Sequence, residues 1–66
     1  MNVTLYSTNC PKCVILEKKL RDKNVEFDII NDVDAMIEKG FMAAPILEVD
    51  GKPMSYMDAN TWVNNI

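Results

Sequence analysis

Two cysteines with a short spacing are the side chains of this sequence best suited to chemistry. Cys10 and Cys13 enclose Pro11 and Lys12 in a Cys-x-x-Cys arrangement. This spacing lets the two sulfurs form and break a disulfide, so thiol-disulfide exchange is the chemistry to consider first. The chain has no histidine, the usual general base, the usual zinc ligand and the usual partner of a cysteine protease nucleophile. Any reaction must therefore use the thiols.

The residues around the cysteines predict a strand, a loop and then a helix. Residues 3–6 are β-branched, apolar and aromatic, which is typical of a strand, and a polar run follows them. The proline after Cys10 suits the first position of a helix, so Cys10 should be the N-cap of a helix over residues 11–23. Free N–H groups and the helix dipole would stabilise a thiolate on Cys10, and Lys12 adds a positive charge nearby. Cys13 lies one turn deeper and is expected to act second, on the mixed disulfide that Cys10 forms.

The next part of the chain predicts a strand and a short helix. Residues 25–29 alternate apolar and polar side chains, as a half-buried strand does. A helix should begin at Asn31 or Asp32, extend through Lys39 and end at Gly40. In the first helix, Cys13, Leu16 and Leu20 recur at helical spacing on one inward stripe, which Val14 and Ile15 widen. The other apolar side chains expected to face the core are Val25, Phe27 and Ile29 in this strand and Val33, Met36 and Ile37 in this helix.

The last third of the chain predicts a β-hairpin and a closing helix. Residues 46–49 and 52–54 flank the pair Asp50-Gly51, which supplies the positive φ angles of a tight two-residue turn. Ser55 and Asp58 have the spacing of a capping box, and an apolar stripe of helical period follows them. An amphipathic helix should therefore end the chain.

The predicted elements follow the order β-α-β-α-β-β-α. The first two strands need a crossover helix and should be parallel, whereas the hairpin adds an antiparallel half. The expected fold is α/β, a four-stranded mixed sheet with helices on its faces. With 66 residues the chain has room for one small core, so residues 1–66 are expected to form a single domain.

Composition narrows the function classes. A net charge of −3 and a pI of about 4.6 disfavour binding to nucleic acid or to anionic lipid. We find neither a secretory signal nor a stretch of transmembrane length, so we expect a cytoplasmic protein. In that reducing compartment a close cysteine pair is more often catalytic or metal-binding than structural. An inert disulfide, and a zinc or iron–sulfur site shared by two chains, are the alternatives for Cys10 and Cys13.

The sequence resembles the glutaredoxin family and its ribonucleotide-reductase-linked redoxin branch. The similar segments are residues 6–13 (YSTNCPKC), Ala44-Pro45 before a strand, and residues 50–52 (DGK). The resemblance implies a thioredoxin-like fold with Cys10 as the nucleophile and Cys13 as the resolving cysteine. It also implies that Pro45 is cis and faces the cysteines, which would expose the backbone of Ala44 to an extended substrate.

The resemblance is weaker where glutaredoxins hold glutathione. Those proteins have a basic residue three positions before the first cysteine, a Thr-Val-Pro and a Gly-Gly, and this chain has Ser7, Ala43-Ala44-Pro45 and Met54-Ser55 there. We therefore expect a thioredoxin-reductase-like flavoenzyme as reductant, with glutathione as the alternative. Tyr6 and Asp58 are further candidates for substrate contact. The expected activity is reduction of a disulfide-containing protein, such as ribonucleotide reductase, by a monomer that needs no cofactor.

Overall fold

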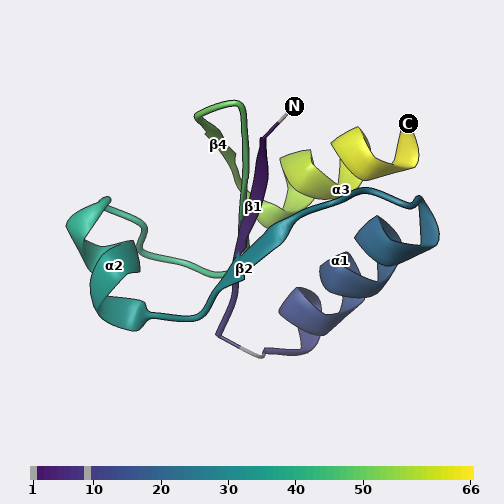
Figure 1. Cartoon of the computed structure of the whole chain (residues 1–66). Coiled ribbons are helices and arrows are strands. Elements are labelled where there is room, and N and C mark those ends of the chain that lie inside the picture. Colours follow the sequence, from purple (N-terminus) through teal and green to yellow (C-terminus); the bar gives the residue numbers. More distant parts are fainter. Residues whose placement is uncertain (1, 9) are drawn as a thin grey trace.

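The computed structural model describes residues 2–8 and 10–66 (Figure 1). The predicted order of strands and helices is confirmed. The elements are β1 (Val3–Tyr6), α1 (Pro11–Asp22), β2 (Asp28–Ile30), α2 (Val33–Glu38), β3 (Ile46–Val49), β4 (Lys52–Met54) and α3 (Tyr56–Asn64).

The strands form one mixed sheet in the order β2-β1-β3-β4. β1 is parallel to β2 and antiparallel to β3, and β3 is antiparallel to β4. Leu5 in the centre of β1 lies next to Ile29 on one side and Leu47 on the other. In Figure 1, α1 and α3 lie together on one side of the sheet, and α2 lies on the other side. The expected α/β architecture with a four-stranded mixed sheet is thus confirmed.

The core lies between the sheet and the helices α1 and α3. Its buried side chains come from β1, β3 and both helices: Val3, Leu5, Leu16, Leu20, Leu47, Ala59 and Val63. Burial of each large aliphatic side chain contributes about 1.5–3 kcal/mol to folding. The same inward stripe of α1 that carries Leu16 and Leu20 also carries Cys13, so core packing fixes the position of the second thiol.

The second strand is shorter than the alternating pattern predicted. Only Asp28–Ile30 pairs with β1, although Val25 and Phe27 still pack against the core. Ile29 was expected in the core but is 45% exposed. The reason is the position of β2 at the edge of the sheet, where it has a neighbouring strand on one flank only.

Two helices bury fewer apolar side chains than their sequences suggest. In α1, Val14 and Ile15 are exposed because only one stripe of the helix meets the sheet and α3. In α2, which has six residues, Met36 is the buried side chain, while Val33 and Ile37 are 53% and 64% exposed. The prediction that these four residues face the core is wrong.

The turn and cap predictions have different outcomes. Asp50 and Gly51 have φ angles of 50° and 83°, so the predicted tight hairpin turn is confirmed. Ser55 is the N-cap of α3, but within the described part of the chain its side chain makes no capping hydrogen bond, so the predicted capping box is not formed. Among the described residues, no helix is long and apolar enough to cross a membrane.

Candidate active site

Cys10 is the N-cap of α1, as the sequence predicts. Its backbone is extended, with φ −73° and ψ 164°, and a proline occupies the first turn after it. The Cys13 N–H donates a hydrogen bond to Cys10 Sγ, with 3.2 Å between nitrogen and sulfur. A backbone N–H at a helix N-terminus stabilises negative charge on the atom it contacts. The helix therefore presents Cys10 Sγ with a donor suited to a thiolate.

The two thiols differ in their access to solvent. Both cysteines are free in the structure; Cys10 is half-buried, whereas Cys13 has no exposed surface. A disulfide approaching from solvent can therefore reach the sulfur of Cys10 but not that of Cys13. Access alone makes Cys10 the sulfur that an incoming substrate meets first.

Hydrogen bonds prepare Cys13 for ionisation. Burial raises the pKa of the Cys13 thiol, but hydrogen bonds with the Cys10 side chain, the Thr8 backbone and the Ser7 side chain outweigh burial and hold this pKa below its ordinary value of 9.0. Ser7 is 2% exposed and directly follows β1. The contacts of Ser7 and Thr8 with Cys13 were not predicted from the sequence. A signal for such a role was available, because both residues link β1 to the cysteine motif.

The peptide bond between Ala44 and Pro45 is cis, as the family resemblance implied. Pro45 is buried, and the Ala44 carbonyl oxygen lies 4.0 Å from Cys10 Sγ. The fold thus brings together two segments that are 34 residues apart in the sequence. The backbone of Ala44 therefore lies beside the sulfur of Cys10.

Lys12, between the two cysteines in the sequence, contacts α3. Its exposed ammonium group lies 5.5 Å from the centre of the Tyr56 ring, in a cation–π contact. Lys12 and Tyr56 therefore form a basic and aromatic border next to the cysteine loop.

Tyr6 is the last residue of β1 and is buried. Its ring is 2% exposed and packs edge-on against Phe41, with 5.0 Å between ring centres. The Lys39 ammonium group lies 5.2 Å from the Tyr6 ring, and the Tyr6 hydroxyl and the Glu48 carboxylate raise the pKa of Lys39. Burial leaves Tyr6 almost no surface for the substrate contact expected from the sequence, so its place in the structure is that of a support.

Asp58 lies on α3 and not in the cysteine loop. It is exposed in the first turn of α3, close in sequence to Tyr56. Among the residues the structure describes, no hydrogen bond or ion pair connects Asp58 to Cys10 or Cys13. Of the residues predicted from sequence, the fold therefore brings together the two cysteines, Ala44 and Pro45, with Lys12 at the border.

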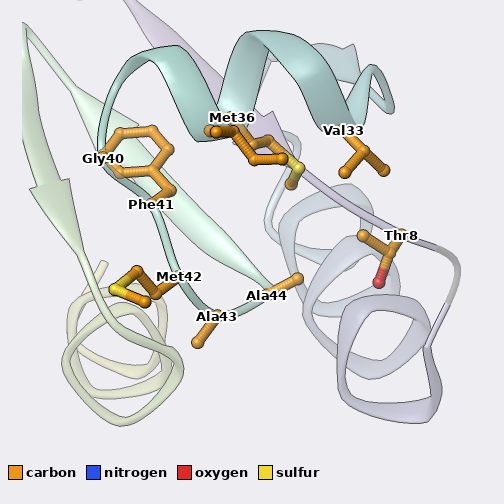
Figure 2. Close-up of a pocket in the computed structure, with 9 residues that line it drawn as sticks. Thr8, Val33, Met36, Gly40, Phe41, Met42, Ala43 and Ala44 are labelled. Atoms are coloured by element: carbon orange, nitrogen blue, oxygen red, sulfur yellow. The ribbon is translucent and has the colours of Figure 1, made fainter.

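An apolar groove, which the sequence analysis missed, lies beside the cysteines. It has a volume of about 590 Å³ and runs between α2 and the segment that leads to Pro45, with Thr8 at one end (Figure 2). Its lining residues are Thr8, Val33, Met36, Ile37, Gly40, Phe41, Met42, Ala43 and Ala44. Val33 and Ile37, assigned to the core from sequence, line this groove instead. A six-residue helix that carries three large apolar side chains is the signal that could have revealed it.

In residues 2–8 and 10–66, no three side chains of the types His, Cys, Asp and Glu lie together as a metal site requires. The Cys10–Cys13 pair would have to be completed by ligands from another molecule to hold an ion in a tetrahedral shell.

The comparisons with known proteins agree with this geometry. No family model matches the sequence. A thioredoxin from Methanothermobacter thermautotrophicus is 36% identical over 58 residues, which cover 79% of this chain and 75% of the relative. The glutaredoxin-like protein NrdH of Lactococcus lactis subsp. lactis is 40% identical over 55 residues, or 73% of this chain and 76% of the relative.

A solved structure shows the same fold. The crystal structure of a mutant of the thioredoxin-like protein BC3987 superposes with a TM-score of 0.76. The match has 21% sequence identity and covers 98% of this chain and 96% of that one. Three observations indicate the same family: relatives of this identity and coverage, a thioredoxin-like fold, and a Cys-x-x-Cys pair at a helix N-terminus. The chain belongs to the glutaredoxin and thioredoxin family of thiol-disulfide oxidoreductases.

Proposed function

We propose that this protein is a glutaredoxin-like reductase of protein disulfides that works by dithiol exchange. One observation carries the proposal: an accessible sulfur, Cys10, accepts a helix N-terminal N–H, and a buried thiol, Cys13, lies one turn behind it. Residues 1–66 would form the single catalytic domain.

In the first step, the Cys10 thiolate attacks one sulfur of the substrate disulfide. A bond forms between Cys10 Sγ and that sulfur, the substrate disulfide breaks, and the other substrate sulfur leaves as a thiolate that takes a proton from water. The Cys13 N–H, at 3.2 Å, stabilises the anion on Cys10 before the attack.

In the second step, the Cys13 sulfur attacks Cys10 Sγ of the mixed disulfide. The substrate's remaining sulfur leaves as a thiol, and Cys10 and Cys13 are joined by a disulfide. In the mixed disulfide Cys10 Sγ has no proton to donate, but the hydrogen bonds from the Thr8 backbone and the Ser7 side chain, which lower the pKa of the Cys13 thiol, still favour the anion that this attack requires. The substrate gains two electrons and the protein loses two, so an external reductant must restore the dithiol.

Substrate positioning is assigned to the residues around Cys10. The backbone of Ala44, 4.0 Å from Cys10 Sγ, is placed to pair with an extended substrate chain, and buried Pro45 holds it there. Lys12 contributes positive charge at the border of the site. Asp58 is a weaker candidate, because its position on α3 is its only link to the site.

The relatives and the departures at the glutathione positions support the proposed reductant and substrate. The names thioredoxin and glutaredoxin-like NrdH support a flavoenzyme of the thioredoxin reductase class as reductant, with glutathione as the alternative. The resemblance to the redoxin branch makes ribonucleotide reductase a candidate substrate. The dithiol form is favoured in a reducing compartment, so the proposed place of action is the cytoplasm. The protein would act there as a monomer that binds neither nucleic acid nor membrane.

A coupled assay tests the reaction and the reductant together. We expect NADPH oxidation with insulin as substrate when thioredoxin reductase is supplied, and a much lower rate with glutathione and glutathione reductase. Cys10→Ser should abolish activity, whereas Cys13→Ser should accumulate a mixed disulfide visible in the intact mass. Activity retained by Cys10→Ser, or bound zinc or an iron–sulfur absorbance in the purified protein, would contradict the proposal.

A further inference from the structure

The helix α2 stands alone on its side of the sheet, whereas α1 and α3 lie together on the other side (Figure 1). We propose that residues 31–42, which are α2 and the residues at its two ends, form a hinged flap that Lys39 latches to the sheet. The flap opens while the core and α1, which carries the cysteines, stay folded. This property belongs to the fold and does not depend on the proposed reductase activity.

The backbone hydrogen bonds of the flap are local. At the start of α2, the Asp32 side chain accepts hydrogen bonds from the N–H groups of Asp34 and Ala35. At its end, the N–H groups of Gly40 and Phe41 donate to carbonyl oxygens of the last turn, both at 2.9 Å. Among the described residues, no backbone hydrogen bond joins α2 to the sheet. Side chains alone therefore hold the flap in place.

The side-chain contacts of the flap are separate from the main core. In the described part of the chain, neither the core cluster of β1, β3, α1 and α3 nor the side chains packed against it include a residue of α2. On the other side of the sheet, Met36 is buried, and Phe41 meets the Tyr6 ring edge-on, with 5.0 Å between ring centres. Opening the flap therefore leaves the main core covered, so it requires less free energy than complete unfolding.

Lys39, the C-cap of α2, connects the helix to the two central strands. Its ammonium group lies 5.2 Å from the centre of the Tyr6 ring of β1 and 3.4 Å from a carboxylate oxygen of Glu48 in β3. The Tyr6 hydroxyl and the Glu48 carboxylate raise the pKa of Lys39, because both stabilise its charged form. Separating α2 from the sheet breaks both contacts at once, so Lys39 has the position of a latch.

Exposed residues on both sides of α2 provide the hinges. Asn31, directly after β2, is exposed, and Met42 is 98% exposed. Firm anchors lie just outside them. The Ile30 carbonyl accepts a hydrogen bond from the Ser7 N–H at 3.0 Å, and Pro45 is buried. A few exposed residues between anchored segments are the usual place for the backbone rotations of a hinge.

Amide hydrogen exchange of the intact protein, followed residue by residue by NMR, tests the flap. Six residues are too few for a stable isolated helix, so the amides of α2 exchange once the flap leaves the sheet. We expect the protection factors of residues 36–41 to be at least about tenfold lower than those of Leu16 and Leu20, which lie in the core. Equal protection would show that α2 opens only when the whole chain unfolds.

Two core variants separate local opening from complete unfolding. Val63→Ala removes part of a buried side chain of α3, on the side of the sheet away from α2 (Figure 1). It should speed exchange at Leu16 and Leu20 about 15-fold and leave residues 36–41 unchanged, because the core stays packed when the flap opens. Ala59→Gly, also buried in α3, is a milder change of about 2- to 5-fold that serves if Val63→Ala does not fold. Acceleration of residues 36–41 by the same factor as α1 would overturn the flap.

Lys39→Met tests the latch, because it removes the charge and keeps a side chain of similar length. Exchange at residues 36–41 should become about 3- to 30-fold faster, the range given by one exposed ion pair and one cation–π contact. Lys52→Met, at an exposed lysine of β4, makes the same change of charge and should leave these amides unchanged. Unchanged exchange in Lys39→Met, or equal acceleration in both variants, would show that Lys39 is not the latch.

Discussion

The difference in accessibility between the two thiols predicts which cysteine an alkylating reagent modifies. Cys13 has no exposed surface, so iodoacetamide can reach it only after a local opening of the first turn of α1. That opening breaks the hydrogen bonds of the Cys13 thiol with Cys10, Ser7 and the Thr8 backbone. At about 0.5–1.5 kcal/mol each, three such bonds cost about 2–4 kcal/mol, which is a protection of about 30- to 1,000-fold.

The lowered pKa of Cys13 does not offset this protection. The hydrogen bonds that hold this pKa below its ordinary value are the ones that the opening breaks, so the thiol that meets the reagent has lost the cause of the shift. Compared with an ordinary accessible thiol, Cys13 should therefore react about 30- to 1,000-fold more slowly.

The chain is convenient for this measurement. Trypsin cleaves after Lys12, so Cys10 and Cys13 fall in different peptides and can be quantified separately by mass spectrometry. A brief pulse of iodoacetamide on the reduced protein, short enough for single modification, should label Cys10 predominantly. In guanidinium chloride, where the opening cost disappears, the two cysteines should be labelled to similar extents. Equal labelling of the folded protein, or predominant labelling of Cys13, would refute the assigned order of the thiols.

Three further predictions concern stability, each read from denaturant unfolding. Leu47→Ala removes a fully buried side chain beside Leu5 and should lower the free energy of unfolding by about 2–5 kcal/mol, whereas exposed Val14→Ala should change it by less than about 0.5 kcal/mol; similar losses would show that the assigned core is wrong. Gly51→Ala, at φ 83°, should cost about 1–2 kcal/mol, and no loss would place a different turn there. The pKa of the Cys13 thiol is lower in the folded protein than its ordinary value of 9.0, which applies to the unfolded chain. Between the folded and the unfolded pKa the unfolded chain therefore binds more protons, and the free energy of unfolding of the reduced protein should rise with pH. This contribution to stability is lost as the pH falls through the folded pKa. The oxidised protein, which has no thiol to titrate, is the control, and an equal slope in both forms would contradict the assignment.

Much of the fold was predictable because local patterns and tertiary packing agree in it. The proline after Cys10 starts α1, and the pair Asp50-Gly51 forms the hairpin turn, as their backbone preferences require. These features depend on residues that are neighbours in the chain. The strand at residues 25–29 was too long in the prediction because its pairing depends on β1, and alternation alone does not reveal that β2 lies at an edge.

The chemistry of the site divides in the same way. The sequence determined the dithiol, its spacing and the position of Cys10 at a helix N-terminus, because all three are local properties of four consecutive residues. The structure alone decided the environment of each sulfur. Cys13 is buried because α1 packs against the sheet, and the backbone of Ala44 approaches Cys10 from a segment 34 residues away.

The groove belongs entirely to the tertiary structure. From the sequence, Val33 and Ile37 are apolar residues of an amphipathic helix, and burial is the usual result of that pattern. In the fold, a helix of six residues buries Met36, whereas Val33 and Ile37 remain exposed and line the groove with Phe41 and Ala44. The period of a sequence indicates which side chains share a face. Only the packing of distant segments decides whether that face is covered by the protein or left for a partner.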